Sequence, residues 1–205
     1  MNVGQIKNIA LKLMDEYSLS GALEGGQLTA DYTLKMNTLI DLAQNEITDH
    51  VGIYATQVIT VGVTTPVLVQ NGYDFYDLNP DIKDFRYVKV SDWPNPFNDY
   101  EVENGQFKIN TAYTGNYGNN GAVFTLHYYK YPVPIDDNTP DSFILEVDRW
   151  TQQAIPYYVA GMCGSSSSED LQLSDKLMAI WATKLNAMTK REIRYPRRSR
   201  EVVWW

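Results

Sequence analysis

The sequence predicts an α+β protein in which a bundle of about four helices carries an inserted antiparallel β-module, sandwich- or barrel-like in form. Near both ends of the 205-residue chain, apolar residues recur at spacings of three and four, the period of an amphipathic helix. The middle of the chain instead holds short runs of β-branched and aromatic residues separated by turn signals. We therefore predict four parts: a helix pair at 1–50, the β-module at 51–138, a second helix pair at 139–193, and a basic tail at 194–205.

Two helices are expected in the first part. The first covers residues 3–17, and the second follows a glycine-rich loop, with Thr29 as its N-cap. The apolar stripes are Val3, Ile6, Ile9, Ala10, Leu13 and Tyr17 in the first helix, and Tyr32, Met36, Leu39, Ile40, Ala43 and Ile47 in the second. The polar residues Asp31, Lys35, Asn37, Asp41 and Asn45 mostly face away from the second stripe. Each helix has one apolar side only, so each needs a partner.

About six strands are expected within residues 51–135. Asn71-Gly72 is a strong signal for a two-residue hairpin turn, and Asn104-Gly105 marks another tight turn. The clearest strand is Val123–Tyr131, which Pro132 ends.

Two further helices are expected after the β-module. The first begins near Asp141 or Ser142, and its apolar stripe is Phe143, Val147, Trp150, Ala154 and Tyr158. Pro156 should kink this helix or shift its start, and Gly161 and Gly164 mark its exit. The last helix begins with a capping box of Ser166 and Glu169 and runs to about Ile193. Its stripe is Leu173, Leu177, Ile180, Trp181, Lys184 and Met188, with Leu185 beside it.

The chain carries no catalytic motif of useful specificity, so we expect no enzyme and no cofactor. His50 and His127 lie far apart in the sequence, and the only cysteine, Cys163, has no motif around it. We expect structural roles for all three, with Cys163 a buried thiol on a helix. No histidine or cysteine cluster has the spacing of a zinc site, and no glycine-rich phosphate loop is present.

Two weaker binding signals lie in the β-module. Asp77, Asn79 and Asp81 have the spacing that opens a calcium loop, but the glycine and the glutamate that such a loop needs later are missing. A polar turn is the simpler interpretation. The aromatic residues Trp93, Tyr100, Tyr113 and Tyr117 are expected in loops, where they stack on sugars or pack against the module or a neighbouring subunit.

The N-terminus has no charged segment followed by an apolar block, and no run of about 18 apolar residues occurs. We therefore expect neither a secretory signal nor a membrane span. A single cysteine favours assembly in a reducing cytosol.

Charge is distributed unevenly along the chain. Residues 190–205 hold six Lys or Arg and two acidic residues, so their net charge is +4. The net charge of the whole chain is −8, so the remaining residues carry a net charge of −12. The chain then ends in an apolar quartet, and Arg and Trp are the residue types most enriched at binding hot spots. The predicted docking residues are Arg194, Arg197, Arg198, Arg200, Val202, Val203, Trp204 and Trp205. Three interpretations stay open for this tail: docking into a partner or neighbouring subunit, folding back on its own bundle, or contact with nucleic acid.

This layout resembles the head-to-tail adaptor, or head-completion, proteins of tailed bacteriophages. The resemblance rests on Ile6–Tyr17, on Lys35–Ile47, and on Leu177–Met188 with the basic tail that follows. It implies a virion protein of the neck, assembled in the host cytoplasm as a homo-oligomeric ring of typically about twelve subunits. The implied partners are the portal protein and the tail or nozzle proteins, with genomic DNA passing through the lumen without sequence-specific binding. The β-module is larger than the simplest members of the family carry, so its role stays open.

The alternatives are a carbohydrate-binding protein and another component of the tail or baseplate. Exposed aromatic residues on the β-module would suit the first of these.

Overall fold

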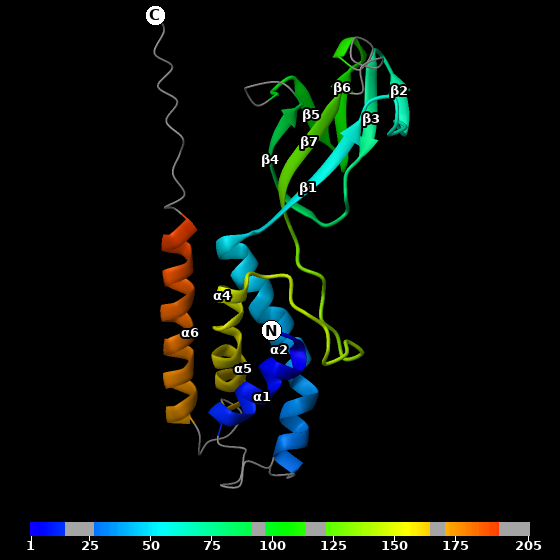
Figure 1. Cartoon of the computed structure of the whole chain (residues 1–205). Coiled ribbons are helices and arrows are strands. Elements are labelled where there is room, and N and C mark those ends of the chain that lie inside the picture. The colour runs from blue at the N-terminus through cyan, green and yellow to red at the C-terminus, as the bar shows by residue number, and fades with distance from the viewer. Residues whose placement is uncertain (15–26, 92–96, 114–121, 165–170, 193–205) are drawn as a thin grey trace, which may run out of the picture. The chain divides into compact units, whose positions relative to one another are not determined.

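The computed structural model describes residues 1–14, 27–91, 97–113, 122–164 and 171–192, and it gives side chains for these residues except 27–31 and 189–192. Within these ranges the protein is α+β, with about five helices and two antiparallel sheets (Figure 1). The chain divides into two compact units. Residues 1–52 and the chain from 132 onward form a helical unit, and Ile53–Tyr131 form a β-unit.

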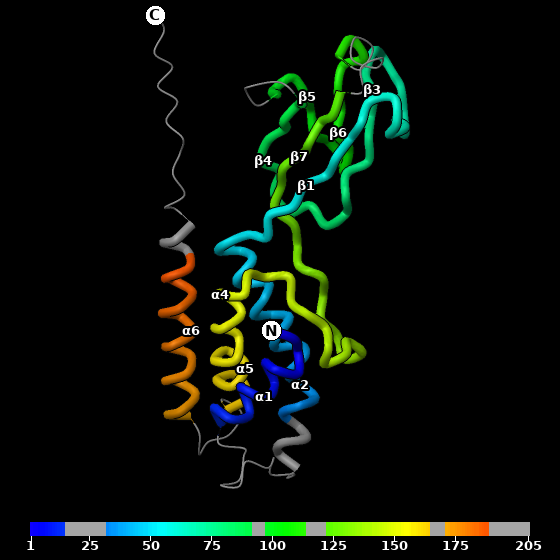
Figure 2. The backbone as a smooth tube through the Cα atoms, viewed as in Figure 1, coloured from blue at the N-terminus to red at the C-terminus, as the bar shows by residue number. Residues whose placement is uncertain are grey.

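The helical unit is built from both ends of the sequence. Its helices are α1 (Val3–Leu13), α2 (Gln27–Val51), α4 (Arg149–Gln152), α5 (Ile155–Gly164) and α6 (Leu171–Glu192). Helix α5 packs against α1, α2 and α6, so helices from both sides of the insertion share one core. The backbone tube leaves this unit after α2 and returns to it after β7 (Figure 2).

The first two helices keep most of their predicted apolar stripes, with corrections at the ends. Helix α1 ends at Leu13, and its buried face consists of Val3, Ile6, Ala10 and Leu11, whereas Ile9 is 39% exposed. Helix α2 begins at Gln27, so Thr29 lies inside the helix and is not its N-cap. The polar residue Asn37, predicted to face away from the stripe, is buried.

The prediction of a helix from Asp141 is wrong. Residues 141–148 contain no α-helix, and Ile144 forms an isolated antiparallel bridge with Asn2. The N–H groups of Val3 and Gly4 donate to the carbonyls of Phe143 and Asp141, at 3.0 and 2.9 Å. The first N–H groups of a helix have no partner within that helix, so α1 draws this segment alongside its N-terminus. These bonds hold the segment away from helical geometry despite its helical spacing.

Two predicted helix-breaking residues occupy specific places in α5. Pro156 is the second residue of α5, so it sets the start of the helix, where its missing N–H costs nothing. Gly161 lies inside α5 and does not mark its exit: a Cβ there would lie 2.9 Å from Cγ and Sδ of Met178 on α6. The hydroxyl of Ser174 donates to the carbonyl of Gly161 at 2.7 Å. The predicted capping box at Ser166 and Glu169 lies outside the described residues.

Within the described residues, the β-unit contains seven strands in two sheets, compared with the prediction of about six. The first sheet has the order β1-β7-β4 and consists of β1 (Ile53–Thr60), β7 (Val123–Lys130) and β4 (Ile82–Val90). The second has the order β2-β3-β6-β5 and consists of β2 (Leu68–Gln70), β3 (Tyr73–Asp77), β6 (Gln106–Asn110) and β5 (Tyr100–Glu103). Both predicted two-residue turns are present.

The turns and the core explain why these strands pair as they do. Asn71 and Gly72 have φ angles of 53° and 80°, and Asn104 and Gly105 have 51° and 74°, as expected for turns whose two central residues are left-handed. The two sheets share one hydrophobic core, in which the ring of Phe107 from β6 lies 6.4 Å from that of Phe124 on β7. The β-unit ends at Tyr131, so residues 132–138, which the sequence prediction assigned to the β-module, belong to the helical unit.

Polar side chains of α2 hold the chain where it returns from the β-unit. Asp41 accepts a hydrogen bond from the N–H of Ile135 at 2.8 Å, and Gln44 donates to the carbonyl of Val133 at 2.8 Å. Asn37 donates to the carbonyl of Asp136 at 2.7 Å. Asn37 and Gln44 are almost fully buried. We call Asn37, Asp41 and Gln44 the polar ladder of α2, and it joins the two parts of the chain that form the helical unit.

We predict that Asp41→Ala destabilises the helical unit by about 1–3 kcal/mol, because the N–H of Ile135 then loses its acceptor. Chemical denaturation followed by far-ultraviolet circular dichroism measures this change. Thr38→Ala, an exposed substitution on the same helix, is the control and should leave the free energy of unfolding nearly unchanged. Equal stability of the Asp41→Ala variant and the wild type would show that the bond between Asp41 and Ile135 contributes nothing.

Candidate interaction surfaces

The predicted docking residues Arg194, Arg197, Arg198, Arg200, Val202, Val203, Trp204 and Trp205 all lie outside the described residues. What the structure does describe is the helix that precedes them. Trp181, Leu185 and Met188 of α6 are buried, and the ring of Trp181 lies 5.1 Å from that of Tyr158 on α5. Helix α6 is therefore anchored in the helical unit as far as Met188.

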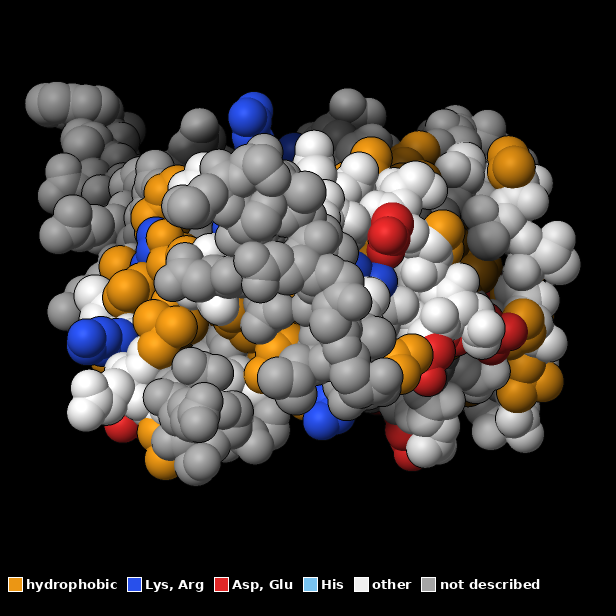
Figure 3. All heavy atoms as spheres, turned by 90° about the horizontal axis from the view of Figure 1, so that it is seen from below, with side chains coloured by type: hydrophobic (Ala, Val, Ile, Leu, Met, Phe, Trp, Pro, Cys, Tyr) orange, Lys and Arg blue, Asp and Glu red, His pale blue; other side chains and the backbone are white. Residues whose placement is uncertain are grey.

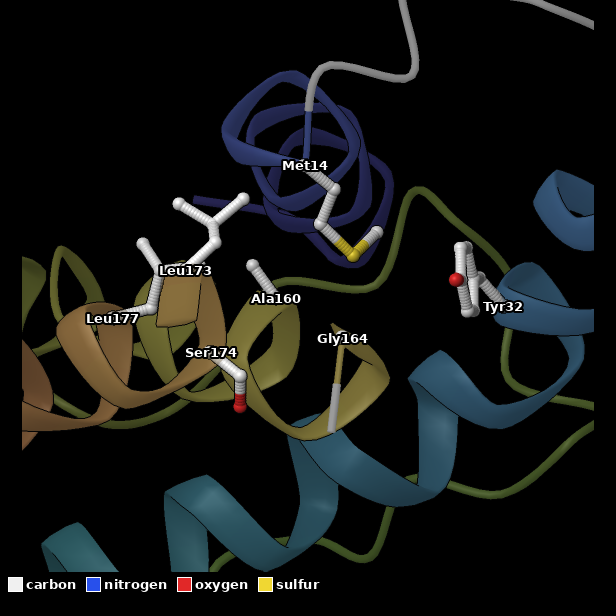
Figure 4. Close-up of a pocket in the computed structure, with 7 residues that line it drawn as sticks. All are labelled: Met14, Tyr32, Ala160, Gly164, Leu173, Ser174 and Leu177. Atoms are coloured by element: carbon white, nitrogen blue, oxygen red, sulfur yellow. The ribbon is translucent and has the colours of Figure 1, made fainter. Parts of the chain in front are cut away.

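The helical unit contains a small internal cavity where α1, α2, α5 and α6 meet (Figure 4). The volume that the centre of a water molecule can occupy in this cavity is about 10 Å³, which is enough for about one water. The lining residues are Met14, Tyr32, Ala160, Gly164, Leu173, Ser174 and Leu177. The hydroxyl of Ser174 already donates to a backbone carbonyl. This cavity is a packing gap and is too small for an organic ligand.

Other candidates for chemistry have structural surroundings. Within the described residues, no group of three or more His, Cys, Asp or Glu side chains is arranged to hold a metal ion. Asn79, from the calcium-like spacing, instead donates from its side chain to the hydroxyl of Tyr128 at 2.8 Å. Cys163 is buried on α5, and burial raises the pKa of its thiol to about 11, which disfavours the reactive thiolate.

The outer face of the β1-β7-β4 sheet carries a row of aromatic side chains that the sequence did not predict. The ring of Tyr87 on β4 stacks on the imidazole of His127 on β7, with centroids 4.3 Å apart. The ring of Tyr54 on β1 lies nearly parallel to the same imidazole at 5.7 Å, and its hydroxyl contacts Nδ1. We call Tyr54, Tyr87 and His127 the aromatic row.

The aromatic row keeps its imidazole neutral. Burial, followed by the positive charge of Lys89, lowers the pKa of His127. The Nε2 atom of His127 is buried and has no hydrogen-bond partner within the described part of the chain, so protonation would leave a charged group without an acceptor. Burial, followed by the neighbouring Tyr87 hydroxyl, raises the pKa of Tyr54 to about 12. Both shifts favour the uncharged forms of His127 and Tyr54 at neutral pH.

A charged pair borders this row. The guanidinium of Arg86 lies 4.4 Å from the ring centre of Tyr129 and 3.3 Å from the carboxylate of Asp84. Two register shifts in β4, one of them between Phe85 and Tyr87, bring Tyr87 opposite His127. The alternation of apolar and polar residues in a strand sequence cannot predict such register shifts.

The aromatic residues proposed for sugar stacking are mostly engaged elsewhere or not described. Tyr100 begins β5 and packs at 5.5 Å from Phe85 and 5.6 Å from Phe107, so it belongs to the core and not to a loop. Tyr113 packs edge-on against Phe97 at 5.2 Å, and its hydroxyl contacts Asp99. Trp93 and Tyr117 lie outside the described residues.

Exposed aliphatic side chains gather near β2. Val63, Val67, Leu68 and Val69 are 45–78% exposed, although Leu68 and Val69 belong to a strand. Elsewhere, on the face seen in Figure 3, hydrophobic side chains lie among charged and polar ones.

Comparison with known proteins gives no family for this chain. No family model matches it, and no curated protein is significantly similar. Within the part of the chain that the structure describes, no helix is long and apolar enough to cross a membrane.

We predict that His127 titrates below its ordinary pKa of about 6.5 and that the stability of the β-unit rises with pH in this range. The unfolded state binds the proton more readily than the native state does. The contribution of the neutral imidazole is thus fully present above about pH 7 and is lost as the pH falls through 6.5 towards the lower native value. Proton NMR of the imidazole resonances measures the titration.

The His50→Gln variant leaves a single imidazole in the chain and makes the assignment unambiguous. In the His127→Gln variant, this part of the pH dependence of unfolding should disappear. A His127 pKa at or above 6.5 would contradict the proposed burial of the neutral form.

Proposed function

We propose that this protein is a structural, non-enzymatic component of a bacteriophage neck, forming a ring between the portal and the tail or nozzle proteins. In this proposal the helices close as one bundle and the two sheets form a sandwich-like insertion. The chain docks on its neighbours through residues 194–205, and DNA passes through the ring without sequence-specific contacts.

The observation that carries this proposal is the shared core of the helical unit. Helix α5, from the second half of the chain, packs against α1 and α2 from the first and against α6. The polar ladder of α2 adds bonds to residues 133–136. A bundle closed by both ends, with a β-module inserted, is the layout that the resemblance to adaptor proteins implies. In such a layout the C-terminal segment continues from a fixed helix, which suits a docking role.

The distribution of charge supports assembly into a ring. A head-to-tail contact between identical subunits requires two different, complementary patches on each subunit. Residues 190–205 have a net charge of +4, and the rest of the chain has a net charge of −12. These two parts of the chain could form the patches of opposite sign. Opposite charges also speed encounter and disfavour wrong partners.

The same charge distribution is compatible with passage of DNA. Strong binding to duplex DNA requires lysine and arginine contacts to many phosphates. A lumen formed by the acidic part of the chain would offer few such contacts, so DNA would slide and not bind.

The alternatives, carbohydrate binding or another tail or baseplate role, have less support. Tyr100 and Tyr113 were two of the four aromatic candidates for sugar stacking, and both rings pack within the β-unit. A stacking platform needs rings that project freely, whereas these two rings already pack against Phe85 and Phe97.

We predict that deleting residues 194–205 abolishes incorporation into the virion neck and leaves the fold intact. The deletion starts beyond α6, which is anchored by Trp181, Leu185 and Met188. Immunoblots of purified particles assembled with the truncated chain measure incorporation, and circular dichroism verifies folding.

The matched control replaces the four arginines of the tail with lysine, which keeps the charge but removes the bidentate guanidinium groups. Partial incorporation of this control would assign the remaining affinity to charge and to the terminal tryptophans. If the truncated chain joins particles as well as the wild type does, residues 194–205 are not the docking element.

A further inference from the structure

An open groove lies along the exposed side of α1. Gln5, Asn8 and Ile9 share one side of this helix, because residues three and four positions apart are neighbours on a helix surface. The groove is lined by these three residues, by Met1, and by Arg149, the first residue of α4. The volume that the centre of a water molecule can occupy there is about 580 Å³. We call it the α1 groove, and it has room for several side chains of a partner segment.

The α1 groove combines an exposed aliphatic side chain with an unpaired cation. Ile9 fits the apolar period of α1, yet it is 39% exposed, so its own unit covers it only in part among the described residues. The exposed guanidinium of Arg149 forms no ion pair within the described part of the chain. The groove therefore suits a partner segment that places a carboxylate next to apolar side chains.

An acidic segment runs along the start of α1. Residues 132–148 contain five acidic residues and no Lys or Arg. Backbone bonds from Val3 and Gly4, and a bridge between Asn2 and Ile144, hold this segment beside the first residues of the chain. Its acidic side chains are all exposed: Asp136, Asp137, Asp141, Glu146 and Asp148. Lys7 offsets one of these charges through its ion pair with Asp141. The surface next to the groove is therefore mainly anionic.

Residues 194–205 carry the reverse of this charge pattern. They contain four arginines and a single acidic residue, Glu201, which Val202–Trp205 follow. The arginines suit the acidic segment, Glu201 suits Arg149, and the apolar quartet suits the exposed surface of Ile9. A partner rich in phosphate would instead meet carboxylates beside the groove, which disfavours nucleic acid as the occupant.

We propose that the α1 groove binds residues 194–205 of a neighbouring copy of this chain. In this contact Arg149 pairs with Glu201 of the partner subunit, and Ile9 packs against Val203 of the partner subunit. The inference rests on the proposed function, in which residues 194–205 are the docking element, and it adds the surface that accepts them. The groove and the docking segment are two different patches on each copy, so the contact is head-to-tail, as a ring requires.

A charge exchange in the full-length chain tests the pairing. Light scattering at concentrations from about 10 μM to 1 mM measures self-association. Arg149→Glu and Glu201→Arg should each weaken it by about fivefold or more, because like charges then face each other, and the double variant should recover most of the loss. Lys176→Glu makes the same change of charge at an exposed site on α6, so it is the matched control and should have no effect.

Cysteine cross-linking tests the geometry. Ile9→Cys and Val203→Cys are introduced into two separate full-length chains of different mass, which are then mixed and mildly oxidised. A disulfide between the two chains is expected. In the control, Ile180→Cys on α6 replaces Ile9→Cys and should link much less, although Ile180 is also 39% exposed. The native Cys163 is buried and does not interfere.

Several results would overturn the inference. A wild-type chain that stays monomeric over the whole concentration range would exclude the contact. A double charge exchange that recovers nothing would show that Arg149 and Glu201 do not meet. Equal linking through Ile9→Cys and Ile180→Cys would indicate collision and not binding. A disulfide that forms only within a chain carrying both Ile9→Cys and Val203→Cys would assign the groove to the chain's own C-terminal segment.

Incorporation into particles separates a failure of this inference from a failure of the proposed function. If the Arg149→Glu variant joins the neck normally while deletion of residues 194–205 abolishes incorporation, the segment docks on another protein. The groove is then the wrong acceptor, and the proposed function stands. If the deletion itself leaves incorporation intact, the docking role of the segment fails, and this inference fails with it.

Discussion

The helical unit depends on hydrogen bonds that close it across a long insertion. The chain leaves α2 at Val51, forms the whole β-unit, and must return to the same unit at Pro132. Asn37, Asp41 and Gln44 bind the backbone of the returning segment, and two of the three are almost fully buried. Buried polar groups are costly when unpaired, so each bond also specifies where the segment must lie. The same mechanism acts at the other end of the unit, where the first N–H groups of α1 bind carbonyls of residues 141–143.

These bonds also explain which parts of the fold the sequence could predict. Helices α2 and α6 and the two Asn-Gly turns follow from local chemistry: apolar periodicity and a tolerance for positive φ. Residues 141–148 do not, because their helical spacing competes with carbonyl bonds to α1 that only the tertiary structure reveals. Asn37 is buried for the same kind of reason. A pattern of polar and apolar residues cannot show that a polar side chain will find a backbone partner about a hundred positions later.

The candidate surfaces divide in a similar way. The arginine- and tryptophan-rich tail is evident from composition alone, because it depends on residue types and not on their neighbours. The aromatic row is not evident, because Tyr87 reaches His127 only through register shifts in β4. Strand β2, with the residue before it, lies between these cases. Its uncharged, aliphatic sequence is visible in residues 67–70, but its position at the end of a sheet follows from the strand order.

The lack of charge in residues 67–70 matters because the strand order places β2 at the edge of its sheet. The same four residues placed between two strands would be an ordinary buried strand, and their lack of charge would need no explanation. At the edge of a sheet, such a sequence invites association, which selection normally opposes with charges or bulges. This chain uses charge at β5, charge with bulges at β4, and local hydrogen bonds at β1.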